Sequence, residues 1–231
     1  MYSNLIVIIL ARANSKRLKN KNLKLIGRKT LVQKAIEIPV SLGITTVVSS
    51  DSRKIRKIAK TYGALPHTRN KKLSRDQTTS EEVVISILNE LKISGMDEIL
   101  LLQPTSPLRQ KNQFLKFLET WENIKRENNA DQAISVTRET SDYWVYRKKN
   151  PVRVRELISN SPRKIPRNSQ QREFLYRENG LYYISKIKTL VRNKSFVNGK
   201  LGLIETDKIT AIDIDDQEDL EIARLIYKKY E

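Results

Sequence analysis

A basic, amide-rich segment directly follows the first apolar run of the chain. Residues 5–11 are uncharged and apolar, which is typical of a strand buried on both faces. The next ten residues, 12–21, contain no glycine and include the cations Arg12, Lys16, Lys19 and Lys21. Open α/β sheets bind phosphate-bearing ligands outside the carboxyl ends of their strands, where backbone N–H groups and cations can gather around an anion. The segment therefore predicts an anion-binding loop.

The loop matches neither of the common nucleotide-binding motifs. No GxxxxGK[ST] sequence occurs, and the loop lacks the glycines of a GxGxxG fingerprint. On composition alone, a solvated basic surface loop is an equally good interpretation. Features elsewhere in the chain are needed to choose between an anion-binding loop and a solvated surface loop.

A pair of carboxylates near the other end of the chain offers complementary chemistry. In residues 211–215, Asp213 and Asp215 alternate with isoleucines, which predicts a short strand with both carboxylates on one face. Two like charges at that spacing repel unless a cation lies between them, and Mg²⁺ on a nucleotide is the natural candidate. A structural alternative is favoured for Asp216, which with Asp219 reads as the N-terminal cap of a helix.

Composition narrows the class of protein. The 231 residues carry a net charge of +18, which favours anionic partners, and a nucleic-acid-binding protein is the rival hypothesis from another class. No aromatic-interleaved basic tract is present, so we expect no nucleic-acid partner. The absence of cysteine excludes thiolate chemistry, and the single histidine, His67, cannot build a triad. Without a membrane-length apolar run or a signal-peptide pattern, we expect a cytoplasmic protein with no membrane partner.

Strand and helix patterns alternate along most of the chain. Strands are expected at 45–50, 64–67, 98–103, 130–137 and 181–184, and helices at 30–42, 53–62, 82–93, 112–126 and 218–230. This alternation predicts βαβ units in a single three-layer α/β domain of nucleotide-binding, Rossmann-like type, with a mainly parallel mixed sheet. Periodicity fades in residues 138–172, which predicts either a surface loop with a hairpin or a small dimerisation lobe within a single domain spanning 1–231.

Three segments together resemble one enzyme family. The loop ARANSKRLKNKN at 11–22, LLQPTSPLR at 101–109 and YRENGLYYI at 176–184 are similar to motifs of the acylneuraminate cytidylyltransferases (CMP-sialic acid synthetases). Arg17 and Lys19 depart from the family pattern, where many members carry Gly and Pro. The resemblance implies the nucleotide-diphospho-sugar transferase type of fold, and a homodimer in which residues 138–172 exchange between subunits.

The resemblance also implies a reaction. CTP and a nine-carbon 2-keto-3-deoxy sugar acid, of the sialic, legionaminic or pseudaminic type, would give a CMP-sugar and pyrophosphate, with Mg²⁺ as cofactor. A cytidylyltransferase for an eight-carbon keto-deoxy acid is the closer alternative.

Site residues follow by their match to the family motifs. The nucleotide would be held by residues of the first loop and of segment 69–80, namely Ala11, Arg12, Asn14, Ser15, Lys21, Asn22, Arg69, Asp76 and Ser80. The sugar would be held by Gln103, Arg177, Asn179 and Tyr183. The metal would be held by Asp213 and Asp215, and the catalytic residues would be Arg12, Lys21 and Asp215.

Overall fold

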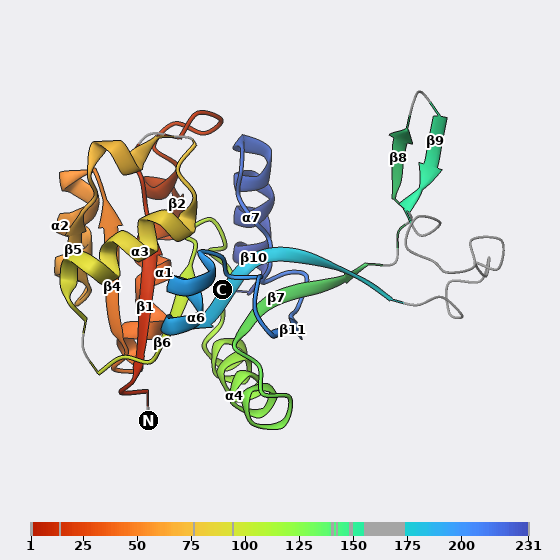
Figure 1. Ribbon diagram of the computed structural model, residues 1–231. Helices are drawn as coiled ribbons and strands as arrows, with labels where there is room; N and C mark the ends of the chain where they lie inside the picture. Colours follow the sequence, from red (N-terminus) through yellow and green to blue (C-terminus); the bar gives the residue numbers. More distant parts are fainter. Residues whose placement is uncertain are drawn as a thin grey trace. The chain divides into compact units, whose positions relative to one another are not determined.

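A computed structural model describes residues 2–13, 15–75, 77–93, 95–139, 141, 143–147, 150–154 and 174–230. The described chain divides into two units, Met1–Val136 with Glu178–Glu231, and Thr137–Arg177. The first unit contains nearly all of a seven-stranded sheet and the helices that cover it (Figure 1). The strands, in order across the sheet, are β11 (Leu201–Glu205), β7 (Gln132–Glu139), β10 (Leu175–Lys186), β6 (Glu98–Leu102), β1 (Leu5–Leu10), β4 (Thr45–Ser50) and β5 (Leu65–Thr68).

Strand β1 is a central strand of the sheet. It pairs with a neighbouring strand along each edge, and its side chains are buried on both faces. It pairs in parallel with β4, Val7 opposite Thr46, and with β6, Val7 opposite Leu100. Strand β5 continues the parallel pairing beyond β4, whereas β10 runs antiparallel to β6. The predicted mainly parallel mixed sheet is therefore confirmed.

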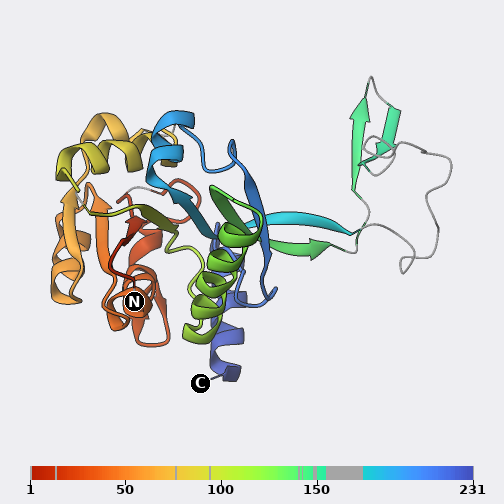
Figure 2. The ribbon, with the colours of Figure 1, turned by 60° about the horizontal axis from the view of Figure 1, so that its bottom comes forward.

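The described chain contains six helices. They are α1 (Leu31–Ser41), α2 (Arg53–Thr61), α3 (Ser80–Leu91), α4 (Lys111–Glu127), α6 (Ile187–Asn193) and α7 (Gln217–Tyr230). Capping boxes at Thr30 and Thr79 start α1 and α3, and the Ser52 hydroxyl caps α2. Apolar side chains of α1, α2 and α4 pack on one face of the sheet, and those of α3 and α6 pack on the other (Figure 2). This gives the predicted three layers.

The order in which the chain forms the strands changes direction beside β1, and we call this place the switch point. From β1 the chain moves through β4 to β5, and then returns to the other side of β1 as β6. The next sheet strand after β1 is β4 and the next after β6 is β7, so the chain continues toward opposite edges of the sheet from these two neighbouring strands. In open α/β sheets such a point, at the carboxyl ends of the strands, is where ligands bind.

A third, smaller core joins the two ends of the chain. The hairpin of β2 (Leu25–Ile26) and β3 (Lys29–Thr30) follows a 3₁₀ turn, Lys21–Leu23, and packs against α7. This core contains Leu18, Ile26, Leu31, Leu108, Ile214, Leu220 and Ala223. Gly27, at φ +60°, lies so close to the Tyr227 ring that a Cβ atom there would be 2.4 Å from Cε1. The core fixes the segment before α7 next to the N-terminal loop.

One predicted element is wrong. Residues 211–215 form no strand; they are an irregular segment that leads into α7. The apolar alternation that suggested a strand reflects the burial of Ile214 in the third core, and no strand in the described ranges pairs with this segment. The sequence also gave no signal for the edge strand β11 or the short helix α6. Asp216 and Asp219 do cap α7, each accepting a backbone N–H hydrogen bond from the other.

The second unit contains the hairpin of β8 (Trp144–Arg147) and β9 (Asn150–Arg153). Within it, Arg177 Nε donates to Glu139 Oε1 at 2.9 Å, and the Arg138 guanidinium lies over the Phe174 ring. A dimerisation role for residues 138–172 stays a prediction. Among the described residues, no helix has the length and apolar character needed to cross a membrane.

Candidate functional site

A cavity of about 470 Å³ opens at the switch point, where β1 and β6 end. Leu10 and Arg12 approach it from β1, and Gln103, Pro104 and Thr105 approach it from β6. Its lining contains one carboxylate, Asp215, and six basic side chains, which are Arg12, Lys16, Arg17, Lys21, Arg69 and Arg75. Such an excess of cations in a concave site favours an anion with several negative charges.

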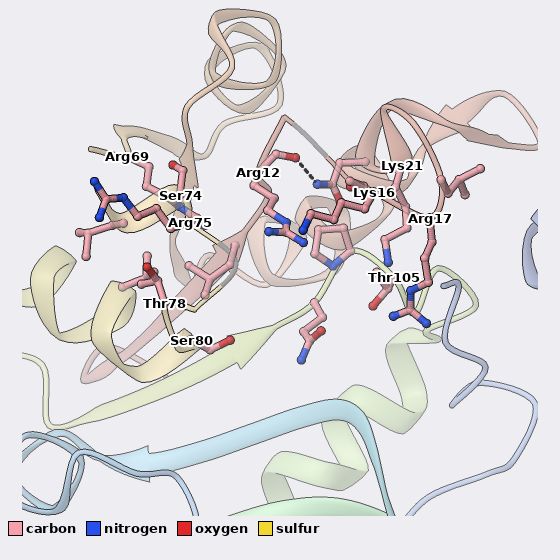
Figure 3. Close-up of a pocket in the computed structure, with 18 of the residues that line it drawn as sticks. Arg12, Lys16, Arg17, Lys21, Arg69, Ser74, Arg75, Thr78, Ser80 and Thr105 are labelled. Carbon is pink, nitrogen blue, oxygen red and sulfur yellow. Dashed lines mark hydrogen bonds between the residues drawn. The ribbon is translucent and has the colours of Figure 1, made fainter. Parts of the chain in front are cut away.

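The first loop is held in shape by side-chain contacts to its backbone. Asn22 Nδ2 donates to the Arg12 carbonyl oxygen at 2.8 Å (Figure 3), and the Ala13 N–H donates to Asp51 Oδ1 at 2.7 Å. Asn20 adopts the left-handed conformation before the 3₁₀ turn, a conformation that asparagine tolerates. These contacts fold the loop so that its basic side chains face the cavity.

The two ends of the chain meet at Lys21 and Asp215. Lys21 Nζ donates to the Ile214 carbonyl oxygen at 2.8 Å and to Asp215 Oδ1 at 3.2 Å, and Arg17 reaches the same Oδ1 at 3.0 Å. The Ile214 N–H donates to the Thr105 carbonyl oxygen at 2.8 Å, which ties this segment to the loop after β6. A carboxylate between two cations is therefore fixed at one wall of the cavity.

Arg69 forms the opposite side of the cavity (Figure 3). Its Nε donates to Ser49 Oγ at 3.3 Å and its Nη2 donates to the Ser49 carbonyl oxygen at 3.1 Å. Burial, with a smaller contribution from Arg12, lowers the pKa of Arg69 to about 10, while Asp51 opposes the change. The guanidinium therefore stays protonated at neutral pH.

The first turn of α3 also faces the cavity. Thr78, Thr79 and Ser80 line it, and Thr79 is the N-terminal cap of the helix. The capping box with Glu82 takes up two of the backbone N–H groups of this turn. The Ser80 hydroxyl is a neutral hydrogen-bonding group beside the cationic part of the cavity.

Eight of the residues expected from the sequence line this one cavity. They are Arg12, Ser15, Lys21, Asn22, Arg69, Ser80, Gln103 and Asp215. Ala11 is fully buried directly before the loop, with its N–H donated to the Ser49 carbonyl oxygen. Asn14 and Asp76 lie outside the described residues.

The other expected residues lie elsewhere in the described structure. Asp213 is exposed and does not line the cavity. Asn179 is buried, its Oδ1 accepting from Ser135 Oγ at 2.6 Å. Arg177 belongs to the second unit. The Tyr183 phenol donates to Glu178 at 2.5 Å; burial raises its pKa, and this carboxylate raises it further.

Other polar residues also line the cavity, and Arg17, Arg75 and Thr105 are three to which no role was assigned from the sequence. Arg17 was noted as a departure from the family pattern without a role. Arg75 stands in the polar segment after β5, where its charge was the available signal. Thr105 follows Gln103 in the motif after β6, and only the fold shows that its carbonyl oxygen accepts from the segment before α7.

Among the described lining residues, Asp215 is the one carboxylate that could bind Mg²⁺. Within the described part of the chain, no cluster of three or more His, Asp or Glu side chains could hold a metal alone. Mg²⁺ bound to nucleotides needs only one or two carboxylates, because phosphate oxygens and water supply its other ligands. Asp215 offers such a carboxylate inside a cavity lined by six cations, so the residues present fit a metal that arrives with a phosphorylated substrate.

A three-layer α/β fold with a polyanion cavity at its switch point defines a nucleotide-binding class of protein. Comparison with family models identifies the particular family: the cytidylyltransferase model matches residues 6–230, and the chain belongs to that family. It is therefore a nucleotidyltransferase.

Curated relatives are distant and differ in length. The chain is 28% identical to an N-acylneuraminate cytidylyltransferase of Escherichia coli over 99% of this chain and 53% of that protein. It is 30% identical to a CMP-N,N'-diacetyllegionaminic acid synthase of Legionella pneumophila, over 91% of this chain and 90% of that protein. The chain thus spans about half the length of the first relative and nearly all of the second.

A solved structure shares the fold. CMP:2-keto-3-deoxy-manno-octonic acid synthetase, determined as a complex with CTP, superimposes with a TM-score of 0.68 at 15% identity. The match covers 99% of this chain and 100% of that one. At this identity the likeness concerns the fold alone.

Proposed function

We propose that this chain transfers a cytidylyl group from CTP to the anomeric hydroxyl of a nine-carbon 2-keto-3-deoxy sugar acid and releases pyrophosphate. The observation that carries the proposal is the meeting of Lys21 and Asp215, 194 positions apart in sequence, at one wall of a six-cation cavity. Family membership supplies the reaction type.

The triphosphate is assigned to the cationic side of the cavity. Arg12 and Lys21 neutralise the phosphate charge that shifts to the leaving pyrophosphate during in-line attack at the α-phosphorus. Lys21 is suited to this because its hydrogen bond to the Ile214 carbonyl oxygen fixes the ammonium before the nucleotide binds. Such preorganised charge is worth more than the same charge on a freely rotating side chain.

Asp215 is assigned to hold the metal that accompanies the triphosphate. When bound, Mg²⁺ supplies Lewis-acid stabilisation of the phosphate oxygens. Before it binds, Arg17 and Lys21 balance the charge of Asp215. Asp213 is the second expected metal ligand; it lies two residues earlier and is exposed.

The base and ribose are assigned to the opposite side of the cavity. Arg69 and Ser80 present guanidinium and hydroxyl groups to the cavity, which suit the N3 and O2 acceptors and N4 donor of cytosine. Ser15 and Asn22 of the first loop are assigned to the nucleotide with them. Gln103, at the end of β6, faces the same cavity and is assigned to the sugar acid. Arg177, Asn179 and Tyr183 are proposed for the sugar because of their position in the YRENGLYYI motif at 176–184.

Two considerations favour a nine-carbon acid. The two curated relatives are named for an N-acylneuraminate and for N,N'-diacetyllegionaminic acid, and the Legionella protein matches this chain over most of both lengths. The three sequence motifs also follow the acylneuraminate pattern. For the same reason we propose that residues 138–172 contribute to a homodimer, which sedimentation of the purified chain would test.

The direct test is a substrate panel. The chain is incubated with CTP, Mg²⁺ and one of four acids: sialic, legionaminic, pseudaminic or the eight-carbon keto-deoxy octonic acid. Pyrophosphate release with a nine-carbon acid, and much slower release with the eight-carbon acid, supports the proposal. Preference for the eight-carbon acid would contradict the substrate assignment, and no CTP-dependent release with any acid would contradict the function.

A further inference from the structure

The only histidine of the chain takes no part in the proposed chemistry, yet it is connected to the cavity. His67 lies in β5 and is buried, 5% exposed. Its Nδ1 is 3.0 Å from Ser49 Oγ, and its Nε2 is 3.0 Å from Glu90 Oε2 on α3. Ser49 is the residue to which Arg69 also donates, from Nε to Oγ and from Nη2 to the carbonyl oxygen.

The hydrogen bonds fix where the protons are. A carboxylate only accepts, so His67 Nε2 carries the hydrogen that is donated to Glu90. The Arg69 Nε–H is donated to Ser49 Oγ, so the hydroxyl hydrogen of Ser49 needs an acceptor, and the unprotonated Nδ1 of His67 is 3.0 Å away. The four residues therefore form a series of hydrogen bonds that all run in one direction: Arg69 donates to Ser49, Ser49 donates to His67, and His67 donates to Glu90.

The ends of this series differ in environment. Ser49 is fully buried and Arg69 is 7% exposed, so water competes little for the hydrogen bonds between them. Glu90 is half exposed and also accepts from Ser86 Oγ at 2.7 Å. The hydrogen bonds from Ser86 and from His67 lower the pKa of Glu90, so it is ionised and available as an acceptor at neutral pH.

We propose that His67 is a positioning residue for nucleotide binding: by accepting from Ser49 it orients the hydroxyl that holds the Arg69 guanidinium in the cavity. This inference rests on the proposed function, because Arg69 is assigned there to the base and ribose of CTP. An arginine side chain has several rotatable bonds, and fixing it in advance removes an entropic cost of binding.

The first readout is the tautomer of His67. Because the chain has a single histidine, its ring nitrogens give unique signals in ¹⁵N-detected spectra of protein made without a histidine tag. The expected result at pH 7.5 is the neutral Nε2–H tautomer. Substitution Ser49→Ala should shift the Nδ1 signal, whereas Thr46→Val, which removes a buried hydroxyl from the same strand, should not. The Nδ1–H tautomer or a doubly protonated ring would overturn the proposal.

The second readout is the affinity for CTP, measured by calorimetry without sugar acid. Removing the acceptor with His67→Leu should weaken binding about threefold to tenfold, the size expected for one hydrogen bond. His67→Asn can offer Oδ1 to Ser49 in place of Nδ1, so its affinity should stay within about twofold of wild type. Wild-type affinity of His67→Leu, or an equal loss in both variants, refutes the positioning role.

A double-substitution cycle tests whether His67 acts through Arg69. In an Arg69→Ala background, His67→Leu should cause no further loss of CTP affinity, because the group that it positions is gone. Additive losses would show a route independent of Arg69 and overturn the proposal. Thermal unfolding without nucleotide serves as the folding control; if His67→Leu does not fold, Ser49→Ala replaces it in the cycle.

The same measurements separate this inference from the proposed function. If wild-type protein binds no CTP, the function fails, while the tautomer and its response to Ser49→Ala still test the hydrogen-bond series. If wild type binds CTP and the His67 variants bind equally well, the function stands and the positioning role fails.

Discussion

Docking of the C-terminal helix on the hairpin after the first loop should control both stability and the site. Gly27→Ala tests this, because Gly27 has φ +60° and an added Cβ would lie 2.4 Å from Tyr227 Cε1. The left-handed backbone costs an alanine about 1 kcal/mol. The Tyr227 ring must also leave its position under the Lys34 ammonium, 3.8 Å from the ring centroid, a contact worth about 0.5–1 kcal/mol. We expect a total loss of about 2 kcal/mol in the free energy of unfolding.

Gly43→Ala is the matched control. Gly43 has φ +69°, but nothing lies within 4 Å of an added Cβ, so only the backbone cost of about 1 kcal/mol applies. Urea denaturation gives both losses, and pyrophosphate release should fall in Gly27→Ala alone, because α7 carries the adjoining Asp215 segment. In a Tyr227→Leu background, Gly27→Ala should cost about as much as Gly43→Ala. Equal losses for the two glycines in the wild-type background would refute the reasoning.

Three further outcomes are expected. Lys21→Ala should lower kcat about 10²-fold or more with a smaller change in the KM for CTP, because its contact strengthens in the transition state; a change in KM alone would contradict this. Asp215→Asn should alter the free energy of unfolding by less than about 1 kcal/mol, since its ion pairs are partly exposed, while pyrophosphate release is lost; a larger loss of stability would show a structural role. Glu90 has a lowered pKa, so it stabilises the fold above its usual pKa of 4.5, and this stability is lost as the pH falls through the lower folded value. The stability difference between wild type and Glu90→Gln, measured at neutral pH and at pH 3, should therefore shrink on acidification.

Much of the fold could be predicted because local signals agree with the tertiary structure. The apolar run of β1 is buried on both faces, and helices begin at Leu31 and Ser80, within two residues of the expected starts at 30 and 82. The 211–215 segment misled the prediction because alternating apolar residues look the same in a strand and in an extended loop with one anchored side chain. Only a pairing partner, which the sequence does not reveal, distinguishes them.

The candidate site was predictable where charge marks it. Arg12 and Lys21 stand out as cations after a buried strand, and Asp215 as a carboxylate before a helix. The surroundings of Asn179 could not be predicted: the resemblance assigns it to the sugar, and only the structure shows that its amide Nδ2 donates to Thr206 Oγ1 at 2.8 Å inside the first unit. Burial cannot be read from the motif alone.

The central claim is that Lys21 and Asp215 act on one metal-bound triphosphate. The most direct test is the affinity for CTP, measured by calorimetry with and without Mg²⁺, in wild type, Lys21→Ala and Asp215→Asn. We predict that Mg²⁺ strengthens CTP binding to wild type and to Lys21→Ala, although Lys21→Ala binds CTP more weakly than wild type does under both conditions. Mg²⁺ should not strengthen CTP binding to Asp215→Asn. An Asp215→Asn protein that keeps the wild-type response to Mg²⁺ would contradict the claim.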